Sequence, residues 1–387
     1  MSLIKIGVIG VGNMGSAHVE LLDKGQIEGA TLTAICSSNE SRIEWVKKHT
    51  QGNVQIFRDV TSFFTQSGID AVLIATPHYS HPDLAKEAFA NGIHVLIEKP
   101  AGVYTKNVLE MNEAAKASNK VFAIMYNQRA NPLYQKLRDL MQSGVLGEIK
   151  RINWIVTDTY RPQSYYDSSK WKATWKGEGG GVLLNQALHH LDILQWTTGH
   201  MPTRVLAASH FGKYHEIEVE DDVTAYVEYE NGATGVFITS TGEAPGTNRF
   251  EIVGNCGKIV VENEEITFYQ LTQPEREFNK SYKGGFGKPE WKEIHIPVKS
   301  ENGNHAVIIQ NWIDSIRNGT PLLSPGEDGV KALEIANAIY LSSWLNEEME
   351  LPVDPDRYFE KLQEKIDTST FVKKHVSNTT LNVKGTH

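Results

Sequence analysis

Residues 4–15 read IKIGVIGVGNMG, an apolar strand that runs directly into the spacing G-x-G-x-x-G at Gly10, Gly12 and Gly15. The first glycine permits a tight turn, the second lets the backbone approach phosphate oxygens, and the third lets a helix pack closely on the strand. The N-terminus of that helix offers backbone N–H groups to a pyrophosphate. Because the motif directly follows a clean strand, the pattern favours a bound dinucleotide over an ordinary glycine-rich turn.

The first third of the chain alternates short apolar runs with amphipathic stretches, which is the pattern of a parallel sheet with helical crossovers. We expect six strands here, at residues 4–10, 32–36, 54–57, 71–75, 94–97 and 121–126, and helices at 16–24, 40–49, 82–91 and 106–118. This alternation predicts an α/β fold with a doubly wound parallel sheet. Ligands of such sheets bind beyond the carboxyl ends of the strands, so the residues that follow each strand are the informative ones.

Composition narrows the class of protein. The chain has 387 residues, of which 40% are hydrophobic, and a net charge of -9, so it is long enough for two well-packed domains and carries no general attraction for nucleic acid or anionic membrane. Cys36 and Cys256 are its only cysteines, which excludes a disulfide framework. The sequence shows no secretion signal or membrane-spanning run. We expect a cytoplasmic protein that acts on a small molecule, without nucleic-acid or membrane partners.

The end of the second strand bears on the choice of cofactor. An NAD-preferring site usually places a carboxylate there to accept from the ribose 2′-hydroxyl, whereas this chain has Ser37, followed by Ser38 and the helical Arg42. These three side chains can donate to a 2′-phosphate, which favours NADP(H). The alternative is that the two serines only cap the next helix, and the nearby Glu40 supports that alternative.

A lysine, Lys99, directly follows the fifth strand in the sequence Glu98-Lys99-Pro100. Partial burial at the nicotinamide end of the crevice would lower the pKa of this ammonium group and let it exchange a proton with a substrate hydroxyl. The alternative is a solvated lysine, or one paired with Glu98. Pro100 favours the first interpretation, because it fixes the backbone beside the lysine.

At this point the chain resembles the Gfo/Idh/MocA oxidoreductases, named for glucose-fructose oxidoreductase, inositol dehydrogenase and a rhizopine-catabolism protein. The matching segments, in the family's order, are residues 10–15, 75–77 with His81, 98–100, 126–129 with Pro132, 179–181, 185–192, 311–319 and 325–342. The resemblance implies a Rossmann domain that binds NAD(P), followed by an α/β domain with a large, open, mostly antiparallel sheet. It also implies that the cofactor contacts, besides the three glycines and the residues after the second strand, are Asn13, Met14, Thr76, Pro77, His81, Glu98, Lys99 and Asn127.

The second half of the chain supports that architecture independently. We expect strands at residues 149–157, 205–211, 223–229, 234–239, 250–253, 258–261 and 266–271, and a two-residue hairpin at Asn231-Gly232. Residues 273–289 have the composition of a long loop, and the tail from about residue 367 that of an arm or a disordered segment. We divide the chain into a dinucleotide-binding domain at 1–127 and a substrate-binding and oligomerisation domain at 128–387. The resemblance further implies a homodimer or homotetramer formed through the second sheet.

A helix opened by the glycines at 179–181 carries the chemical centre of the second domain. Asn185, His189 and Asp192 share one face of that predicted helix. His189 has the pKa range of a proton carrier at neutral pH, and Asn185 can orient a sugar hydroxyl. The family commonly has an acidic residue where this chain has Asn185, so proton transfer would rest on Lys99 with His189. The alternative for His189 and His190 is one packed and one solvated histidine, and we expect no metal site because adjacent histidines cannot converge on one ion.

The aromatic and cationic segment 160–175, YRPQSYYDSSKWKATW, precedes those glycines. Aromatic faces stack on sugar C–H surfaces, and tyrosine and lysine donate to hydroxyls, so this segment is suited to form a lid over a polyol. The predicted substrate contacts are Tyr160, Trp171 and Lys172, together with Lys99, Asn185 and His189. The alternative is a packed crossover in which Trp171 and Trp175 fill a small core.

The sequence thus predicts an NAD(P)-dependent dehydrogenase that acts on the CH–OH group of a sugar, polyol or sugar derivative. The nicotinamide would exchange hydride with a carbinol or ketone carbon, Lys99 and His189 would move the hydroxyl proton, and Asn185 would orient the substrate. The alternative is a non-catalytic regulatory protein of the same fold that binds a dinucleotide or a sugar. A flavin enzyme is disfavoured by the Glu-Lys-Pro element.

Overall fold

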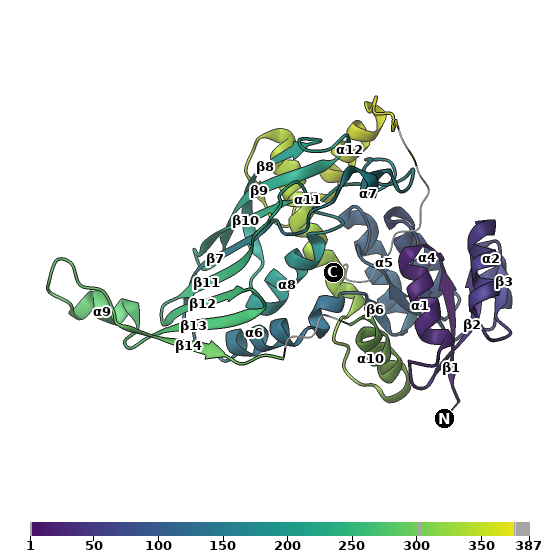
Figure 1. The fold of residues 1–387 in the computed structure, drawn as a ribbon, viewed down its shortest axis with the longest axis horizontal. Coiled ribbons are helices and arrows are strands. Elements are labelled where there is room, and N and C mark those ends of the chain that lie inside the picture. Colours follow the sequence, from purple (N-terminus) through teal and green to yellow (C-terminus); the bar gives the residue numbers. More distant parts are fainter. Residues whose placement is uncertain (1, 300–303, 375, 377–387) are drawn as a thin grey trace.

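The computed structural model describes residues 2–299, 304–374 and 376. Its strands form two separate sheets, one of six strands and one of nine, with helices between the two (Figure 1). In these described ranges, no helix is long and apolar enough to cross a membrane.

The six-stranded sheet confirms the predicted doubly wound parallel fold. Its strands are β1 (Ile4–Ile9), β2 (Ala30–Cys36), β3 (Gln55–Phe57), β4 (Ala71–Ile74), β5 (His94–Ile97) and β6 (Phe122–Ile124), and its helices are α1 (Asn13–Asp23), α2 (Glu40–His49), α3 (Val60–Gln66), α4 (His81–Ala90) and α5 (Thr105–Ser118). The strand order is β3-β2-β1-β4-β5-β6 and every pair is parallel. Because the order reverses between β1 and β4, the carboxyl ends of these two strands open a crevice for a ligand.

The glycine turn between β1 and α1 has the geometry that its sequence predicts. Gly10 has a φ of +87°, in the left-handed region that L side chains rarely adopt. A Cβ added to Gly15 would lie only 1.9 Å from the carbonyl oxygen of Gly10, so this glycine allows the helix to approach the turn. A Cβ on Gly12 would meet no atom within 4 Å, which leaves open space beside the backbone where a phosphate would lie.

The nine-stranded sheet is mostly antiparallel, as expected. Its strands are β7 (Ile149–Val156), β8 (Pro202–Phe211), β9 (Glu220–Tyr229), β10 (Thr234–Ser240), β11 (Asn248–Gly254), β12 (Gly257–Glu262), β13 (Glu265–Leu271), β14 (Trp291–Ile296) and β15 (Met349–Glu350). The order is β14-β13-β12-β11-β7-β10-β9-β8-β15, and β7 and β10 form its one parallel pair among the described strands. The predicted hairpin at Asn231 and Gly232 joins β9 to β10, and Gly232 has a φ of +78°.

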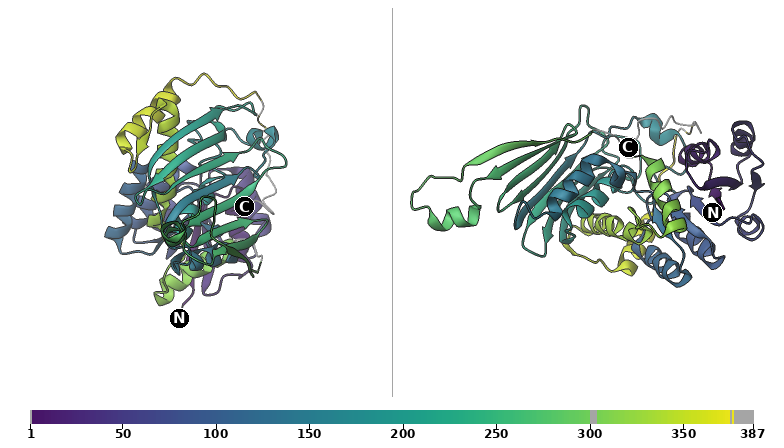
Figure 2. Two further views of the ribbon diagram at one scale, coloured as in Figure 1. Left: turned by 90° about the vertical axis from the view of Figure 1, so that its left-hand side faces the viewer. Right: turned by 90° about the horizontal axis from the view of Figure 1, so that it is seen from below.

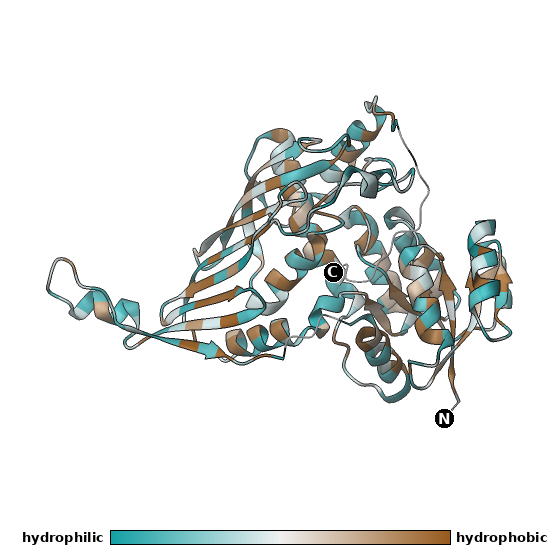
Figure 3. Ribbon diagram, viewed as in Figure 1, coloured by the Kyte–Doolittle hydropathy of each residue, from teal (hydrophilic) through white to brown (hydrophobic). Residues whose placement is uncertain are grey.

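Helices cover only the inner face of this sheet. α6 (Pro132–Gln142), α8 (Leu188–Thr198) and α11 (Gly329–Leu345) lie between it and the first sheet (Figure 1). The outer face, seen in the left view of Figure 2, presents strands rather than helices. Residues of contrasting hydropathy alternate along these strands, as Figure 3 shows, so the inner side chains form a core. Trp154 and Phe250, stacked at 4.2 Å between ring centroids, are part of it.

Several elements depart from the sequence prediction. The interpretation of 273–289 as a plain loop is wrong, because α9 (Glu275–Ser281) lies within it, and β14 and β15 were not anticipated. The helix expected from residue 185 begins only at Leu188, because residues 182–187 form hydrogen-bonded turns. α12 (Pro355–Asp367) ends where the tail was expected to begin; residues 375 and 377–387 of that tail lie outside the described residues.

The predicted boundary at 127/128 is crossed by a helix from the second half. α10 (His305–Asn318) packs its apolar face, including Ile308 and Trp312, into the same core as Ile6 and Val8 of β1. The chain therefore returns to the first sheet after completing most of the second one.

A buried arginine fastens the start of the second half to two of its helices. Arg129, in a short 3₁₀ turn (Asn127–Ala130) after β6, donates to both carboxylate oxygens of Asp192 in α8, at 2.8 and 2.6 Å. It also donates to Asp328, just before α11, at 2.7 Å. The side chains of Arg129 and Asp192 are each 1% exposed. Asp192 therefore anchors α8. Its side chain does not line the cavity that Asn185 and His189 line, although the sequence placed all three on one helix face.

Replacement of Asp192 by alanine tests this anchor. Because the change leaves a buried guanidinium without its bidentate partner, we expect Asp192→Ala to lower the free energy of unfolding by about 3 to 5 kcal/mol. Urea denaturation followed by tryptophan fluorescence measures the change. The control is Glu348→Ala, which removes a half-exposed carboxylate paired with Arg204 and should cost less than about 1 kcal/mol. Equal, small losses for the two variants would contradict the anchoring role.

Candidate functional site

A cavity of about 1570 Å³ lies at the carboxyl ends of the first sheet. Its lining comes from the glycine turn, from the ends of β2, β4 and β5, and from segment 160–172 and residues 185–189 of the second half. Pockets for a single small ligand usually have about 300 to 1,000 Å³. The cavity is therefore large enough for a dinucleotide together with a second molecule.

Most of the residues predicted for the site line this one cavity. They are Gly10, Gly12, Asn13, Met14, Ser37, Ser38, Arg42, Thr76, Pro77, Glu98, Lys99, Asn127, Tyr160, Trp171, Lys172, Asn185 and His189. The elements that carry them are separated by up to 179 residues of sequence, so only the packing of the two halves brings them together.

Two predicted cofactor contacts, Gly15 and His81, do not line the cavity. Gly15 faces the carbonyl oxygen of Gly10 and serves the packing of α1 against the turn. His81 is fully buried, with its ring nitrogens 2.8 Å from the carbonyl oxygen of Pro100 and 2.7 Å from that of Thr76. His81 thus connects the loops after β4 and β5. From the loop after β4, His78 lines the cavity instead.

The end of β2 presents cationic and hydroxyl groups to the cavity. Besides Ser37, Ser38 and Arg42, the lining includes Arg58, which the sequence analysis did not single out. Glu40 is not among the lining residues and forms an ion pair with Arg58 at 2.6 Å. The part of the cavity nearest β2 is thus rich in donors.

Glu98 is paired with a histidine and not with the neighbouring ammonium group. Its Oε1 lies 2.6 Å from Nε2 of the fully buried His18 in α1. Burial alone would raise the pKa of Glu98, but the hydrogen bond and charge of His18 outweigh it and hold the pKa at about 2. The other oxygen, Oε2, accepts from the backbone N–H of Lys99 at 3.2 Å. Glu98 is therefore a fixed anion at the base of the cavity, and the predicted alternative of a Glu98–Lys99 ion pair is not formed.

The side chain of Lys99 extends from the end of β5 to the second half of the chain. Its Nζ donates to the backbone carbonyl oxygen of Asn185 at 2.8 Å and lies 3.4 Å from Oδ1 of the same residue. Burial lowers the pKa of Lys99, although Glu98 and Glu178 oppose that shift. A buried lysine that contacts only neutral acceptors loses its proton more readily than a surface lysine.

A carboxylate that the sequence analysis missed, Glu178, completes this cluster. It is 2% exposed and accepts from the side-chain amide of Asn185 and from the backbone N–H of Ala173. Burial raises its pKa, and the hydrogen bonds from these two donors oppose the shift. Glu178 stands directly before the glycines at 179–181, so that glycine run was the only sequence signal for it.

His189 lines the cavity from the first turn of α8 and is 6% exposed. Its ring meets the edge of Tyr126 at 6.2 Å between centroids. His190 turns instead toward Trp154, with 5.1 Å between ring centroids. Of the adjacent histidines, the structure thus brings His189 into the same cavity as Lys99.

The segment 160–175 divides between the two predicted interpretations. Trp171 lines the cavity and meets the ring of His78 edge to face at 5.5 Å. Trp175 is 4% exposed and packs against Tyr340 and Trp344 in a small core. One tryptophan therefore faces the cavity, and the other holds the segment in place.

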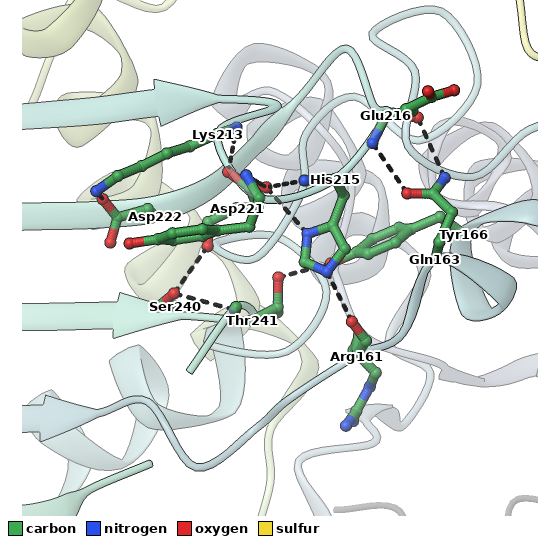
Figure 4. Close-up of polar contacts among 12 residues, drawn as sticks. Arg161, Gln163, Tyr166, Lys213, His215, Glu216, Asp221, Asp222, Ser240 and Thr241 are labelled. Atoms are coloured by element: carbon green, nitrogen blue, oxygen red, sulfur yellow. Dashed lines mark hydrogen bonds and ion pairs between the residues drawn. The ribbon is translucent and has the colours of Figure 1, made fainter. Parts of the chain in front are cut away.

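A polar network fixes the position of this segment (Figure 4). Asp221 in β9 accepts from His215 Nδ1 at 3.0 Å, and the other ring nitrogen of His215 lies 2.7 Å from the carbonyl oxygen of Arg161. Burial would raise the pKa of Asp221, but His215 and two backbone N–H donors keep the pKa below its ordinary value. Tyr166, in the short helix α7 (Gln163–Asp167), is bonded through its hydroxyl to Thr241 at 2.7 Å.

Near the C-terminal end of the described chain, Lys373 also secures the segment. Its Nζ donates to the carbonyl oxygens of Tyr166 and Ser169 at 2.5 and 2.8 Å. Lys373 therefore contacts the segment 160–175, part of which lines the cavity.

The residues that line the cavity fit a dinucleotide. The open space at Gly12, the N-terminus of α1 with no acidic residue in its first turn, and the donors at the end of β2 suit the pyrophosphate and ribose of a dinucleotide. Among the described residues there is no group of three or more histidine, cysteine or acidic side chains suited to a metal ion.

Comparison with known proteins agrees with this geometry. Residues 4–126 match the model of the NAD-binding Rossmann fold of the GFO_IDH_MocA oxidoreductase family, and residues 138–351 match that family's C-terminal α/β domain.

Named relatives extend over nearly the whole chain. The myo-inositol 2-dehydrogenase of Thermotoga maritima is 25% identical over 87% of this chain and 95% of its own length, and the rhizopine catabolism protein MocA of Rhizobium meliloti is 26% identical over 87% and 94%. Among solved structures, the WlbA dehydrogenase of Chromobactrium violaceum, in complex with NADH and UDP-GlcNAcA, is 28% identical with a TM-score of 0.77, over 92% of this chain and 97% of its own. With both of its domains matched, the chain belongs to the Gfo/Idh/MocA family and is an oxidoreductase with an NAD-binding Rossmann domain.

Proposed function

We propose that this protein is an NAD(P)-dependent dehydrogenase that oxidises a CH–OH group of a sugar, polyol or sugar derivative. The observation that carries the proposal is that Lys99 and His189 line the same cavity as the glycine turn. When bound, the nicotinamide supplies the group that accepts or returns the hydride. Gly10, Gly12 and the N-terminus of α1 would hold the pyrophosphate.

The protein's own part in the reaction is to orient the substrate and move a proton. Lys99 accepts the proton of the reacting hydroxyl during oxidation and returns it during reduction, because burial lowers its pKa toward the working range. His189, which lines the same cavity, assists this proton transfer. The backbone carbonyl oxygen of Asn185 fixes the position of the ammonium group, and its side-chain amide is held by Glu178.

The relatives support a polyhydroxylated substrate. The inositol dehydrogenase of Thermotoga maritima acts on a cyclic polyol, and the WlbA dehydrogenase was solved with UDP-GlcNAcA, a nucleotide-linked sugar acid. The cavity has the volume for either class beside a dinucleotide. Trp171 offers an aromatic face to a sugar ring, and Tyr160 and Lys172 offer donors to its oxygens.

The residues at the carboxyl end of β2 favour NADP(H) as the cofactor. No carboxylate lines the cavity among the described residues there, whereas Ser37, Ser38, Arg42 and Arg58 do. Donors of this kind match a 2′-phosphate, and the missing carboxylate removes the usual partner of a free 2′-hydroxyl.

We also propose that a second copy of the chain covers the outer face of the nine-stranded sheet. Leu206 of β8 and Tyr226 of β9 stand opposite each other in register and are 47% and 38% exposed. Paired apolar side chains on a sheet face without helices are typical of a subunit contact. The low cysteine content suits a protein of the reducing cytoplasm.

Substitution of the lysine tests the catalytic proposal. We expect Lys99→Met to retain NAD(P)H binding, measured by fluorescence titration, and to lose about 10²- to 10⁴-fold in kcat on inositols or sugars that the parent protein oxidises. The control is Lys116→Met, on the exposed side of α5, which should keep full activity. Undiminished turnover by Lys99→Met would remove the proton-transfer role. A parent protein that binds the cofactor but oxidises no sugar or polyol would favour the regulatory alternative.

Removal of the β2-end arginine tests the cofactor preference. We expect Arg42→Ala to reduce kcat/KM for NADP by about tenfold and to leave kcat/KM for NAD nearly unchanged, because only NADP carries the 2′-phosphate. Lys47→Ala is the matched control, since Lys47 lies on the same helix and pairs with Glu44 on its exposed side. A parent protein that prefers NAD, or an equal loss with both cofactors, would refute the preference.

A charge on the outer sheet face tests the subunit contact. We expect Leu206→Glu to shift the protein from an oligomer to a monomer in sedimentation equilibrium, with an unchanged circular dichroism spectrum, because a buried carboxylate there would be unpaired. A monomeric parent protein, or an oligomer that tolerates the change, would contradict the proposal.

A further inference from the structure

The segment 160–175, which lines part of the cavity, carries a buried lysine whose ammonium group no acidic side chain contacts. Lys172 is 8% exposed and lines the cavity. Its Nζ lies 3.7 Å from the centroid of the Tyr165 ring. Within the described part of the chain it has neither a hydrogen-bond acceptor nor an ion-pair partner. This ammonium group therefore lacks a counter-charge. One aromatic face compensates only part of the hydration that the group loses on burial.

A second cation lies at the same tyrosine. The guanidinium carbon of Arg161 is 5.4 Å from the centroid of the Tyr165 ring, and Arg161 also lines the cavity. One guanidinium nitrogen donates to the backbone carbonyl oxygen of Tyr160 at 2.9 Å, and no carboxylate pairs with the group among the described residues. The backbone of Arg161 is held by His215 and Thr241, so this cation is positioned in advance (Figure 4).

The charges around this part of the cavity do not balance. Lys99 and Lys172 both lie near the carboxylate of Glu178, Lys99 is influenced more strongly by Glu98, and Arg161 adds positive charge beside both lysines. The oxygens of Glu178 are occupied by neutral donors, the amide of Asn185 and the backbone N–H of Ala173. The remaining carboxylate of the cavity floor, Glu98, is committed to His18. An anionic ligand would restore the balance.

We propose that Lys172 and Arg161 form a subsite for an oxyanion, a carboxylate or a phosphate, carried by the sugar that is oxidised. The inference rests on the proposed function and narrows its substrate class from sugars and polyols in general to acidic ones. Lys172 and Lys99 line the same cavity, so we place the anionic group on or next to the ring that reacts at Lys99. Burial lowers the pKa of Lys172 to about 8, and an oxyanion bound beside it would raise that pKa again.

Calorimetric titration of the 387-residue protein saturated with NADPH tests the subsite, because the reduced cofactor cannot accept hydride from a hydroxyl-bearing carbon of the probe. The probes are myo-inositol, glucuronate, glucose 6-phosphate, UDP-glucose and UDP-glucuronate. We expect at least one anionic probe to bind about tenfold or more tightly than neutral myo-inositol. We expect Lys172→Met to weaken that probe by about 10- to 100-fold, which is at least about tenfold more than it weakens myo-inositol. The comparison of glucuronate, glucose 6-phosphate and UDP-glucose shows which group supplies the oxyanion.

Three further variants control the experiment. Lys172→Arg keeps the charge and should retain most of the affinity for the anionic probe, while Lys176→Met removes an exposed lysine of the same segment and should change nothing. If Lys172→Met does not fold, Arg161→Met provides the same comparison from the other cation.

The subsite is overturned if no anionic probe binds more tightly than myo-inositol, or if the Lys172 and Arg161 variants weaken neutral and anionic probes alike. Either result, together with intact NADPH binding and oxidation of a neutral polyol, leaves the proposed dehydrogenase function standing. Failure of cofactor binding in the same titrations counts against the dehydrogenase itself, so the two failures are distinguishable.

Discussion

The buried guanidinium of Arg129 is the constraint on which the arrangement of the cavity depends. It follows the last strand of the first sheet and is held by carboxylates that precede α11 and lie within α8. Desolvated charges of this kind are stable only in nearly ideal geometry, so they tolerate little displacement of one element against the other. His189 stands one turn of helix before Asp192. Fixing Asp192 on Arg129 therefore also fixes where His189 enters the cavity that Lys99 reaches from β5.

The electrostatics of the cavity follow from which charges are already committed. Glu98 carries a fixed negative charge because His18 satisfies it from α1, on the first-sheet side of the cavity. Glu178 is satisfied by neutral donors within its own segment. The two carboxylates are thus used to hold backbone and helix positions. Among the described residues, Arg161, Lys172 and the ammonium form of Lys99 have no direct carboxylate partner. Positive charge is therefore available to bind an anionic ligand. The attraction is stronger there than in water, because buried surroundings screen charges less.

The sequence was most informative where local rules govern structure. The glycine spacing after β1 and the short apolar runs predicted the first sheet and most of its strands, because tight turns and buried strands depend on neighbouring residues. The helix expected from residue 185 begins later because Gly181 and Leu183 donate their N–H groups to Glu220, a residue of β9 that is distant in sequence. Glu178 and His78 were missed for the same reason. Their positions are set by contacts across the fold, His78 by the carbonyl oxygen of Glu178, and no local pattern reports such a contact.

The amide at position 185 gives the cavity a different proton balance from that of a carboxylate. A carboxylate in contact with Lys99 would stabilise the ammonium form and raise its pKa. Here the acid, Glu178, is placed one side chain further away and binds the amide nitrogen of Asn185, while the oxygens of Asn185 face Lys99. Lys99 is thereby held in position by neutral acceptors, and burial decides its pKa. Orientation and charge stabilisation, which one carboxylate would combine, are divided between two residues, and the division favours the neutral amine that must accept the proton of a substrate hydroxyl.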